Sequence, residues 1–244
     1  MSPNIDLSSF QTPMHVLIIG ASGGIGSALY EHLKDHPQVA LLVGTARQIV
    51  PGMVALDLSE EQSISSVAAD LKHRAPFNLI VNATGFLHGD TTFPEKKLDD
   101  LNQNDLQAFF NINAIAPALL YRYFLPLLSK DGKAVMAHLS ARVGSISDNQ
   151  IGGWYGYRAA KAAQNMITKT ASIEARRKFK NAILLGLHPG TVDTGLSAPF
   201  QSAVSPNKLF SAQDAAGHLL KQINKASLEQ SGSCIAWDGA TIPF

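Results

Sequence analysis

Short apolar runs alternate along this chain with longer segments in which apolar residues recur at helical spacing. Such runs are typical of strands buried on both faces, and their alternation with helices predicts a parallel sheet. The pattern therefore predicts an α/β fold, with a doubly wound parallel sheet of about seven strands and helices on both faces. The expected strands are 16–19, 40–43, 53–56, 79–82, 134–139, 182–187 and 234–237, and the expected helices are 25–33, 64–71, 106–128, 154–177 and 212–223.

Three features interrupt this pattern. Pro117 lies inside the third expected helix, where its missing N–H predicts a kink or a local break. Segments 85–97 and 190–211 match no regular element, and loops this long in a compact domain are often lids or binding loops. The second segment follows a strand end, where open α/β sheets bind ligands. A variable surface loop is the alternative.

Chain length limits the number of domains. At 244 residues the chain is long enough for one well-buried α/β domain and short for two. We therefore expect a single domain over residues 1–244, in which residues 1–13 form a flexible N-terminal arm.

A glycine-rich turn, Gly20-Ala21-Ser22-Gly23-Gly24-Ile25-Gly26, follows the apolar run 15–19 and opens the first expected helix. Strand, tight turn and helix in this order form the Rossmann-type unit that seats a dinucleotide pyrophosphate on a helix N-terminus. Glycines used for steric reasons alone are the alternative.

The second chemical feature is Tyr157-Arg158-Ala159-Ala160-Lys161. Positions i and i+4 lie on one helix face, so the Lys161 ammonium is expected near the Tyr157 phenol, where its charge favours the phenolate. Such a tyrosine is suited to proton transfer near neutral pH. Tyr155 has Ala159 as its i+4 partner, and we expect it to pack or to line the pocket.

Composition excludes several other classes of function. A net charge of +1 gives no general attraction to nucleic acid or to anionic membranes. Cys234 is the single cysteine and cannot form an internal disulfide. The N-terminus lacks a secretion signal, and no window reaches the roughly 18 apolar residues of a membrane span, so we expect a cytoplasmic protein. His88, His138 and His188 lack metal-ligand spacing, so no metal is expected.

The glycine spacing Gly-x-x-x-Gly-x-Gly together with Tyr157 and Lys161 resembles the short-chain dehydrogenase/reductase family over nearly the whole chain. Segments 144–146, 152–158, 188–190, 238–239 and 242–244 look like the C-factor and sniffer type of carbonyl reductases. The resemblance implies cofactor contacts from Gly20, Ser22, Gly24, Ile25, Gly26, Asp57, Leu58, Asn82, Ala83, Thr84, Gly85, Pro189, Gly190, Thr191, Val192 and Thr194, with Asn82 also tying strands together.

The residues after the second expected strand bear on the choice of cofactor. A carboxylate there accepts hydrogen bonds from the ribose hydroxyls of NAD, whereas a guanidinium pairs with the 2′-phosphate of NADP. This chain has Thr45-Ala46-Arg47 and no acid. We therefore expect NADP(H) rather than NAD(H), with Arg47 as the phosphate ligand and Thr45 or Gln48 assisting. The alternative for Arg47 is an exposed loop cation.

The resemblance also implies a reaction and the residues that carry it. Hydride moves between the nicotinamide and a carbonyl or secondary alcohol substrate while Tyr157 acts as acid and base. Lys161 lowers the tyrosine pKa, binds the nicotinamide ribose and links to a relay water held near Asn113. An amide inside a helix that bonds its own backbone is the alternative for Asn113.

The catalytic serine departs from the family pattern. The family places it three positions before a glycine, and counted back from Gly144 that position holds Ala141. Ser140 lies one residue earlier, and one step along a strand turns a side chain to the opposite face. Ser140 is nevertheless the serine we expect, if the strand end bulges or unwinds. Ser145 and Ser147, in the following loop, are the alternatives.

Two hypotheses follow for the function. The first is an NADP(H)-dependent carbonyl reductase or alcohol dehydrogenase. The second is an NADP-binding sensor or signalling protein of the same fold, with weak or no catalysis because of Ala141. The two longest expected helices carry more alanine and leucine than one sheet face needs, and family members pair these helices across a dimer interface. We therefore expect a homodimer or homotetramer.

Overall fold

The computed structural model of the chain describes residues 5–203, 205 and 208–244. Its main feature is an eight-stranded sheet of order β10-β9-β6-β5-β4-β1-β2-β3, parallel except for β10, which runs antiparallel to β9. All seven expected strands are present, and the expected α/β fold is confirmed. The strands are β1 (Met14–Ile19), β2 (Val39–Ala46), β3 (Val54–Ala55), β4 (Leu79–Asn82), β5 (Ala134–Leu139), β6 (Ala182–His188), β9 (Ser233–Ala236) and β10 (Thr241–Ile242).

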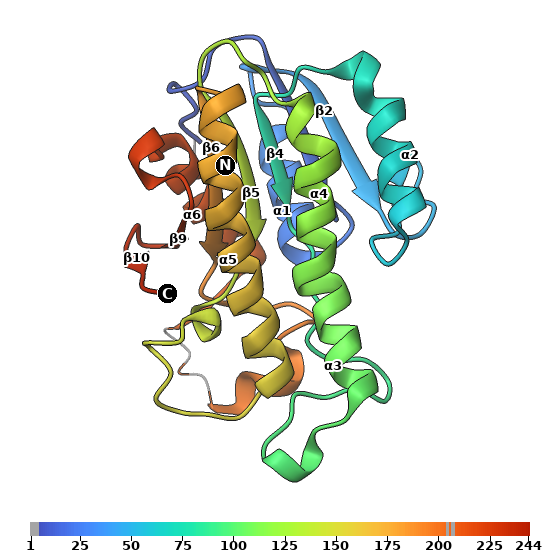
Figure 1. The fold of residues 1–244 in the computed structure, drawn as a ribbon. Coiled ribbons are helices and arrows are strands. Elements are labelled where there is room, and N and C mark those ends of the chain that lie inside the picture. The colour runs from blue at the N-terminus through green and yellow to red at the C-terminus, as the bar shows by residue number, and fades with distance from the viewer. Residues whose placement is uncertain (1–4, 204, 206–207) are drawn as a thin grey trace.

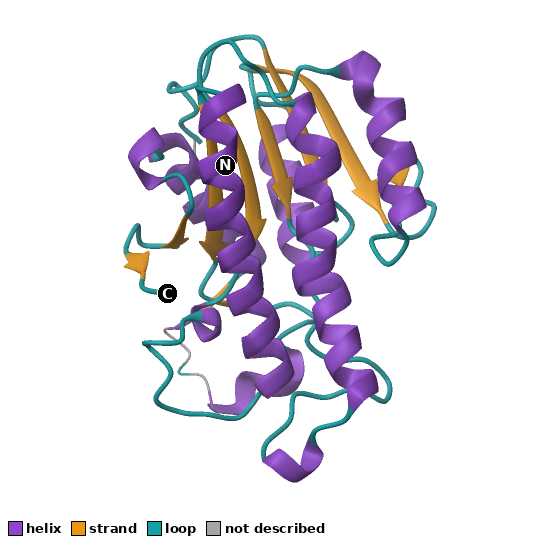
Figure 2. Ribbon diagram, in the orientation of Figure 1, coloured by secondary structure: helices purple, strands orange, loops and turns teal. Residues whose placement is uncertain are grey.

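Helices cover both faces of the sheet (Figures 1 and 2). The α1 and α6 helices pack on one face, and α2, α4 and α5 pack on the other. Successive side chains of β1 point to opposite faces of the sheet and so contribute to both core layers. Val16 and Ile18 face α1 and α6, whereas Leu17 and Ile19 face α2, α4 and α5. The helices are α1 (Gly24–Leu33), α2 (Glu61–Leu71), α3 (Gln103–Phe110), α4 (Ala116–Phe124), α5 (Tyr155–Lys178) and α6 (Ala212–Lys225).

The expected helix 106–128 is divided into parts. A π-helical turn, Asn111–Ile115, lies between α3 and α4, and a 3₁₀ turn follows at Leu125–Leu127. Pro117 is the second residue of α4 and has no N–H to donate to the Asn113 carbonyl, so the regular ladder is interrupted there. The expected break is therefore present, and it lies at the turn that carries Asn113.

The N-terminal segment differs from the expected flexible arm over residues 1–13. Leu7 and Phe10 are buried in the core between the sheet and the α1 and α6 helices. The Lys133 ammonium donates to the Ser9 hydroxyl and lies 4.9 Å from the Phe10 ring centroid. The expectation is thus wrong for the described part of the arm, because two apolar side chains anchor it; the first four residues lie outside the described residues.

The two long segments behave differently. Segment 85–97 contains no helix or strand, as expected. Segment 190–211 contains β7 (Thr191–Val192) and β8 (Leu209–Phe210), which pair in parallel, so the expectation of no regular element is wrong there. Positions 204, 206 and 207 lie outside the described residues.

Candidate functional site

A cleft of about 790 Å³ opens where the parallel strands end, at the edge of the sheet to which the strand arrows point in Figure 2. Most of the expected site residues lie on its wall, whereas Gly26, Asn82 and Asn113 are buried behind it. The expected residues that line the cleft are Gly20, Ser22, Gly24, Ile25, Arg47, Asp57, Leu58, Ala83, Thr84, Gly85, Ser140, Tyr157, Lys161, Pro189, Gly190, Thr191, Val192 and Thr194.

The glycine turn after β1 leaves space that side chains would fill. Gly20 has φ +83°, and a Cβ at Gly24 would lie 2.5 Å from Thr194 Cγ2. A Cβ at Gly26 would overlap the Gly20 carbonyl oxygen, so this glycine lets α1 pack against the strand end. No side chain among the described residues caps α1, and its first N–H groups remain available to an anion. The turn therefore fits a pyrophosphate.

The ends of β2 and β3 form the next part of the wall. Arg47 is exposed, and its guanidinium makes no hydrogen bond or ion pair with the described residues. Thr45 is buried, and its hydroxyl oxygen accepts from the Gly20 N–H, so it supports the glycine turn. Hydrogen bonds from Ser59 hold the pKa of the Asp57 carboxyl below its usual value, and the Arg47 charge adds to this effect. This end of the cleft thus holds one unpaired cation and one carboxylate that is already hydrogen-bonded.

Asn82 ties two strands together behind the cleft, as the resemblance implied. Its Oδ1 accepts from both the N–H and the hydroxyl of Thr84, and its Nδ2 lies 3.0 Å from His138 Nδ1 on β5. Burial lowers the pKa of His138 to about 3, so the imidazole is neutral and accepts at Nδ1. The β4 turn is therefore fixed relative to β5.

Tyr157 and Lys161 lie together on the wall near the end of β5. Their exposed fractions are 6% and 2%, and Lys161 Nζ is 5.8 Å from the Tyr157 ring centroid. The ammonium donates to the Leu139 carbonyl oxygen at 2.8 Å and to Gln164 Oε1 at 2.9 Å. Burial raises the pKa of Tyr157, which differs from the expected lowering by Lys161. The phenol is therefore protonated, which is the form that donates to a substrate oxygen.

Burial also lowers the pKa of Lys161 from 10.5 to about 7, which predicts a pH-dependent stability. Between these two values the unfolded chain binds more protons than the folded one, so the free energy of unfolding should increase as pH rises through this window. The Lys161 contribution should reach about 1.4 kcal/mol per pH unit. Denaturant unfolding of the cofactor-free protein and of Lys161→Met, compared from pH 7 to pH 10, isolates it. An unchanged difference between the two proteins across this range would contradict the prediction.

Asn113 joins the π-helical turn to the start of segment 85–97. Its Nδ2 donates to the carbonyl oxygens of Phe86 and Phe109, and its Oδ1 accepts from the Phe86 N–H. A Cβ at Gly85 would lie 3.6 Å from Asn113 Oδ1 and 4.0 Å from Lys161 Nζ. The amide thus bonds backbone groups, as in the alternative interpretation, while its oxygen and the lysine flank the same small space.

The Ser140 hydroxyl is hydrogen-bonded within the protein. The hydroxyl donates to Asn165 Oδ1 on α5 at 2.7 Å, and the Ser140 N–H donates to the Leu187 carbonyl oxygen. Pairing with β6 thus continues one residue beyond β5, so the strand end neither bulges nor unwinds, although Ser140 lines the cleft. The assignment of Ser140 as the substrate-binding serine therefore stays a prediction, without the strand distortion that it assumed. Ala141 instead packs in the cluster that contains Tyr157.

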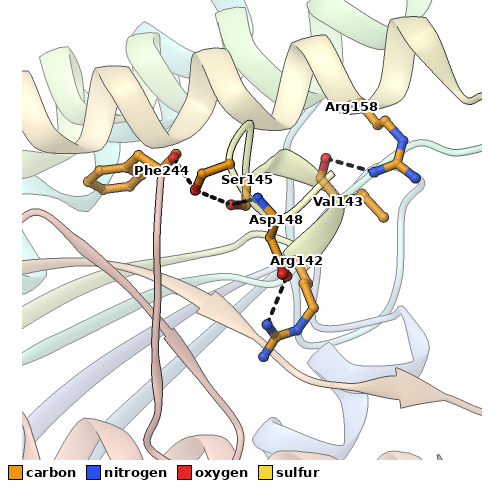
Figure 3. A network of polar contacts seen from close by, with 7 residues as sticks. Arg142, Val143, Ser145, Asp148, Arg158 and Phe244 are labelled. Atoms are coloured by element: carbon orange, nitrogen blue, oxygen red, sulfur yellow. Dashed lines mark hydrogen bonds and ion pairs between the residues drawn. The ribbon is translucent and has the colours of Figure 1, made fainter. Parts of the chain in front are cut away.

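Ser145 and Ser147 are engaged in the loop between β5 and α5, and Figure 3 shows Ser145 beside Asp148 in this loop. Ser145 Oγ accepts from the Asp148 N–H, and the Ser147 hydroxyl donates to the Phe244 carbonyl oxygen. The described cleft wall includes neither serine. An ion pair between Arg142 and Asp148, 2.9 Å long, closes the same loop. The structure therefore brings none of the three serines into the position that Ala141 occupies.

An apolar wall beside Tyr157 was not predicted. Leu87, Val143, Trp154 and Phe200 line the cleft there, and the Trp154 ring centroid lies 6.2 Å from that of Tyr157 and 5.0 Å from that of Phe200. These residues come from connecting segments between the helices and strands. The hydrophobic periodicity of the sequence does not predict how such segments fold. The signal available in the sequence was the expectation that segments 85–97 and 190–211 are binding loops, because Leu87 and Phe200 belong to them.

Among the residues that the structure describes, no cluster of three or more histidine, cysteine or acidic side chains could hold a metal ion. No helix within the same residues has the length and apolar character needed to cross a bilayer.

Comparison with known proteins agrees with this geometry. The short chain dehydrogenase family matches residues 14–205. The C-signal protein of Myxococcus xanthus is 31% identical over 147 residues, which cover 60% of this chain and 83% of that protein. Among solved structures, the carbonyl reductase Sniffer of D. melanogaster has a TM-score of 0.83 at 22% identity, covering 96% of this chain and 100% of that chain. An NADPH-bound carbonyl reductase from chicken fatty liver has a TM-score of 0.80 at 24% identity, covering 100% of this chain and 97% of that chain. Because the family match spans most of the sequence, the protein belongs to the short-chain dehydrogenase family.

Proposed function

We propose that the protein is an NADP(H)-dependent carbonyl reductase for small to medium, partly apolar carbonyl compounds, with the reverse oxidation of alcohols at the same site. The observation that carries this proposal is the pair Tyr157 and Lys161, buried side by side on the wall of a cleft that begins at a free helix N-terminus. The bound nicotinamide supplies or accepts the hydride. The apolar wall that contains Trp154 and Phe200 supports an apolar group on the substrate.

Three side chains carry out the proton transfer in the proposed reaction. Tyr157 is protonated and donates its proton to the substrate oxygen, which becomes an alkoxide as hydride arrives. Lys161, held by the Leu139 carbonyl oxygen, stabilises in its protonated form the phenolate that remains. Asn113 and Lys161 flank the space beside Gly85, where a water would return a proton to Tyr157.

The activity is tested directly. Purified protein should oxidise NADPH when it is offered a panel of aldehydes, ketones and quinones, followed by loss of NADPH absorbance. The absence of turnover above that of Tyr157→Phe with every compound would contradict the proposal.

Arg47 should select NADPH. A guanidinium paired with a phosphate typically contributes 1.5–3 kcal/mol, so Arg47→Ala should weaken NADPH binding by about 10- to 100-fold and leave NADH binding nearly unchanged. Titration calorimetry with both cofactors measures this difference. Arg176→Ala is the control, because that arginine is exposed at the far end of α5. Equal losses for the two cofactors would contradict a role at the 2′-phosphate.

The second candidate function is an NADP-binding sensor with weak or no catalysis. Ala141 in the serine position and the engagement of Ser140 with Asn165 favour it. NADP binding without turnover on the panel, together with no gain of activity in Ala141→Ser, would support the sensor over the enzyme.

We also propose a homodimer or homotetramer. Met166 and Ile173 on α5 are exposed by 66% and 51%, and Ile115, just before α4, is exposed by 49%. Pairing of these helices across two chains would bury apolar side chains that the described chain leaves exposed. Analytical ultracentrifugation measures the assembly, and Met166→Lys should weaken it.

A further inference from the structure

Glu95 is a buried acid to which the proposed reaction assigns no role. It lies in segment 85–97, its exposed fraction is 2%, and the described cleft wall does not include it. Both carboxylate oxygens accept from the Gly156 N–H, at 3.1 and 3.2 Å. The Glu95 carbonyl oxygen also accepts from the Trp154 N–H. One residue therefore binds the chain on both sides of Tyr155, where α5 begins.

A carboxylate suits this place for two reasons. The first N–H groups of a helix have no partner within the helix and carry partial positive charge. The residue that precedes α5, Trp154, provides no side-chain cap, so Glu95 supplies the acceptor from a distant segment. Gly156 makes the approach possible, because a Cβ there would lie 2.8 Å from Glu95 Oε1 and 2.6 Å from Phe109 Cδ2.

Trp154 shows that the start of α5 is constrained. Its φ of 54° lies in the left-handed region, which a bulky side chain rarely adopts and which the surrounding contacts must maintain. The hydrogen bond from its N–H to Glu95 is one of these contacts. In this conformation the Trp154 ring packs against both Tyr157 and Phe200 on the cleft wall.

We propose that Glu95 is a positioning residue for Tyr157. This inference rests on the proposed reductase function. By fixing the first turn of α5, Glu95 sets the position of the Tyr157 hydroxyl, three residues beyond Trp154, and holds the Trp154 ring against the substrate space. Segment 85–97 is then tied at both ends, through Phe86 to Asn113 and through Glu95 to Gly156.

Three substitutions separate geometry from charge. Glu95→Ala removes the hydrogen-bond acceptor. Glu95→Asp keeps the charge but shortens the side chain by one methylene. Glu95→Gln keeps the side-chain length and one acceptor oxygen. Because a misplacement of about 1 Å can cost about 100-fold in rate, we expect kcat to fall about 10- to 100-fold in the Ala and Asp variants. The Gln variant should retain most of the activity. NADPH affinity should stay within about twofold in all three, since the contact lies outside the cofactor wall. Glu174→Ala, an exposed acid on α5, is the control.

A measurement without turnover tests the same inference. Amide hydrogen exchange at Gly156 and the NMR shifts of the Tyr157 ring should change in Glu95→Ala and Glu95→Asp but not in Glu174→Ala. Unchanged exchange and ring shifts, a wild-type kcat in Glu95→Asp, or parallel losses of kcat and NADPH affinity would each overturn the positioning role. If the wild type reduces no carbonyl at all, the proposed function fails, while the exchange and ring shifts still decide whether Glu95 positions Tyr157.

Discussion

Tyr157→Phe is expected to lower kcat for carbonyl reduction by about 10³-fold, within the range of 10²–10⁴ typical of a general acid. The phenol lies on the cleft wall beside the apolar side chains, and the substitution removes only its oxygen. Phenylalanine keeps the ring that packs against Phe109 and Trp154, so the fold and the cleft should be unchanged. Single-turnover reduction with bound NADPH measures the chemical step, and titration calorimetry should give the wild-type affinity for NADPH.

Tyr155→Phe provides the matched control. Tyr155 has no lysine one turn further along, its side chain is 37% exposed, and the described cleft wall does not include it. Its phenylalanine variant should retain the wild-type kcat. A Tyr157→Phe protein with more than about a tenth of the activity would show that another group or water supplies the proton, and the mechanism would have to be abandoned.

The sequence predicted the layers of the fold because burial on two faces leaves a strong pattern. Every central strand is a short apolar run between helices, and this pattern alone placed seven strands. The two-residue strands β7, β8 and β10 are too short to carry a period and were missed. Leu7 and Phe10 show a related limit, since two apolar residues in a polar segment were enough to anchor it to the core.

The site was predictable where chemistry depends on local spacing. The glycine turn and the i, i+4 pair of Tyr157 and Lys161 required no knowledge of distant segments. Ser140 lines the cleft, but its hydroxyl donates to Asn165, and the strand-end distortion that the choice of this serine assumed is not present. The pKa of Tyr157 depends on burial, which one sequence does not report.

Segments far apart in the chain supply the parts that sequence reasoning missed. Glu95 accepts a hydrogen bond from Gly156, which lies 61 positions further along the chain. The Phe200 ring packs against that of Trp154, although the two residues belong to different connecting segments. No periodicity links such residues, so only the folded chain shows them together. Loops of this kind shape the wall beside Tyr157, which explains why the family was easier to predict than the form of the cleft.

Ala141→Ser is expected to raise kcat by about 10- to 100-fold, because a hydroxyl donor to a developing oxyanion commonly contributes 10²–10³ in rate and a grafted one recovers part of it. Ala141 packs in the cluster that contains Tyr157, so a serine there starts next to the proton donor, whereas Ser140 is bound to Asn165. Ser140→Ala, which removes a hydroxyl that already donates to Asn165, should leave the rate nearly unchanged. Initial rates with one aldehyde and one ketone compare the three proteins. A gain in Ala141→Ser would mean that Tyr157 and the cofactor are already in place for reduction, whereas no gain, with NADPH binding intact, would favour the sensor hypothesis.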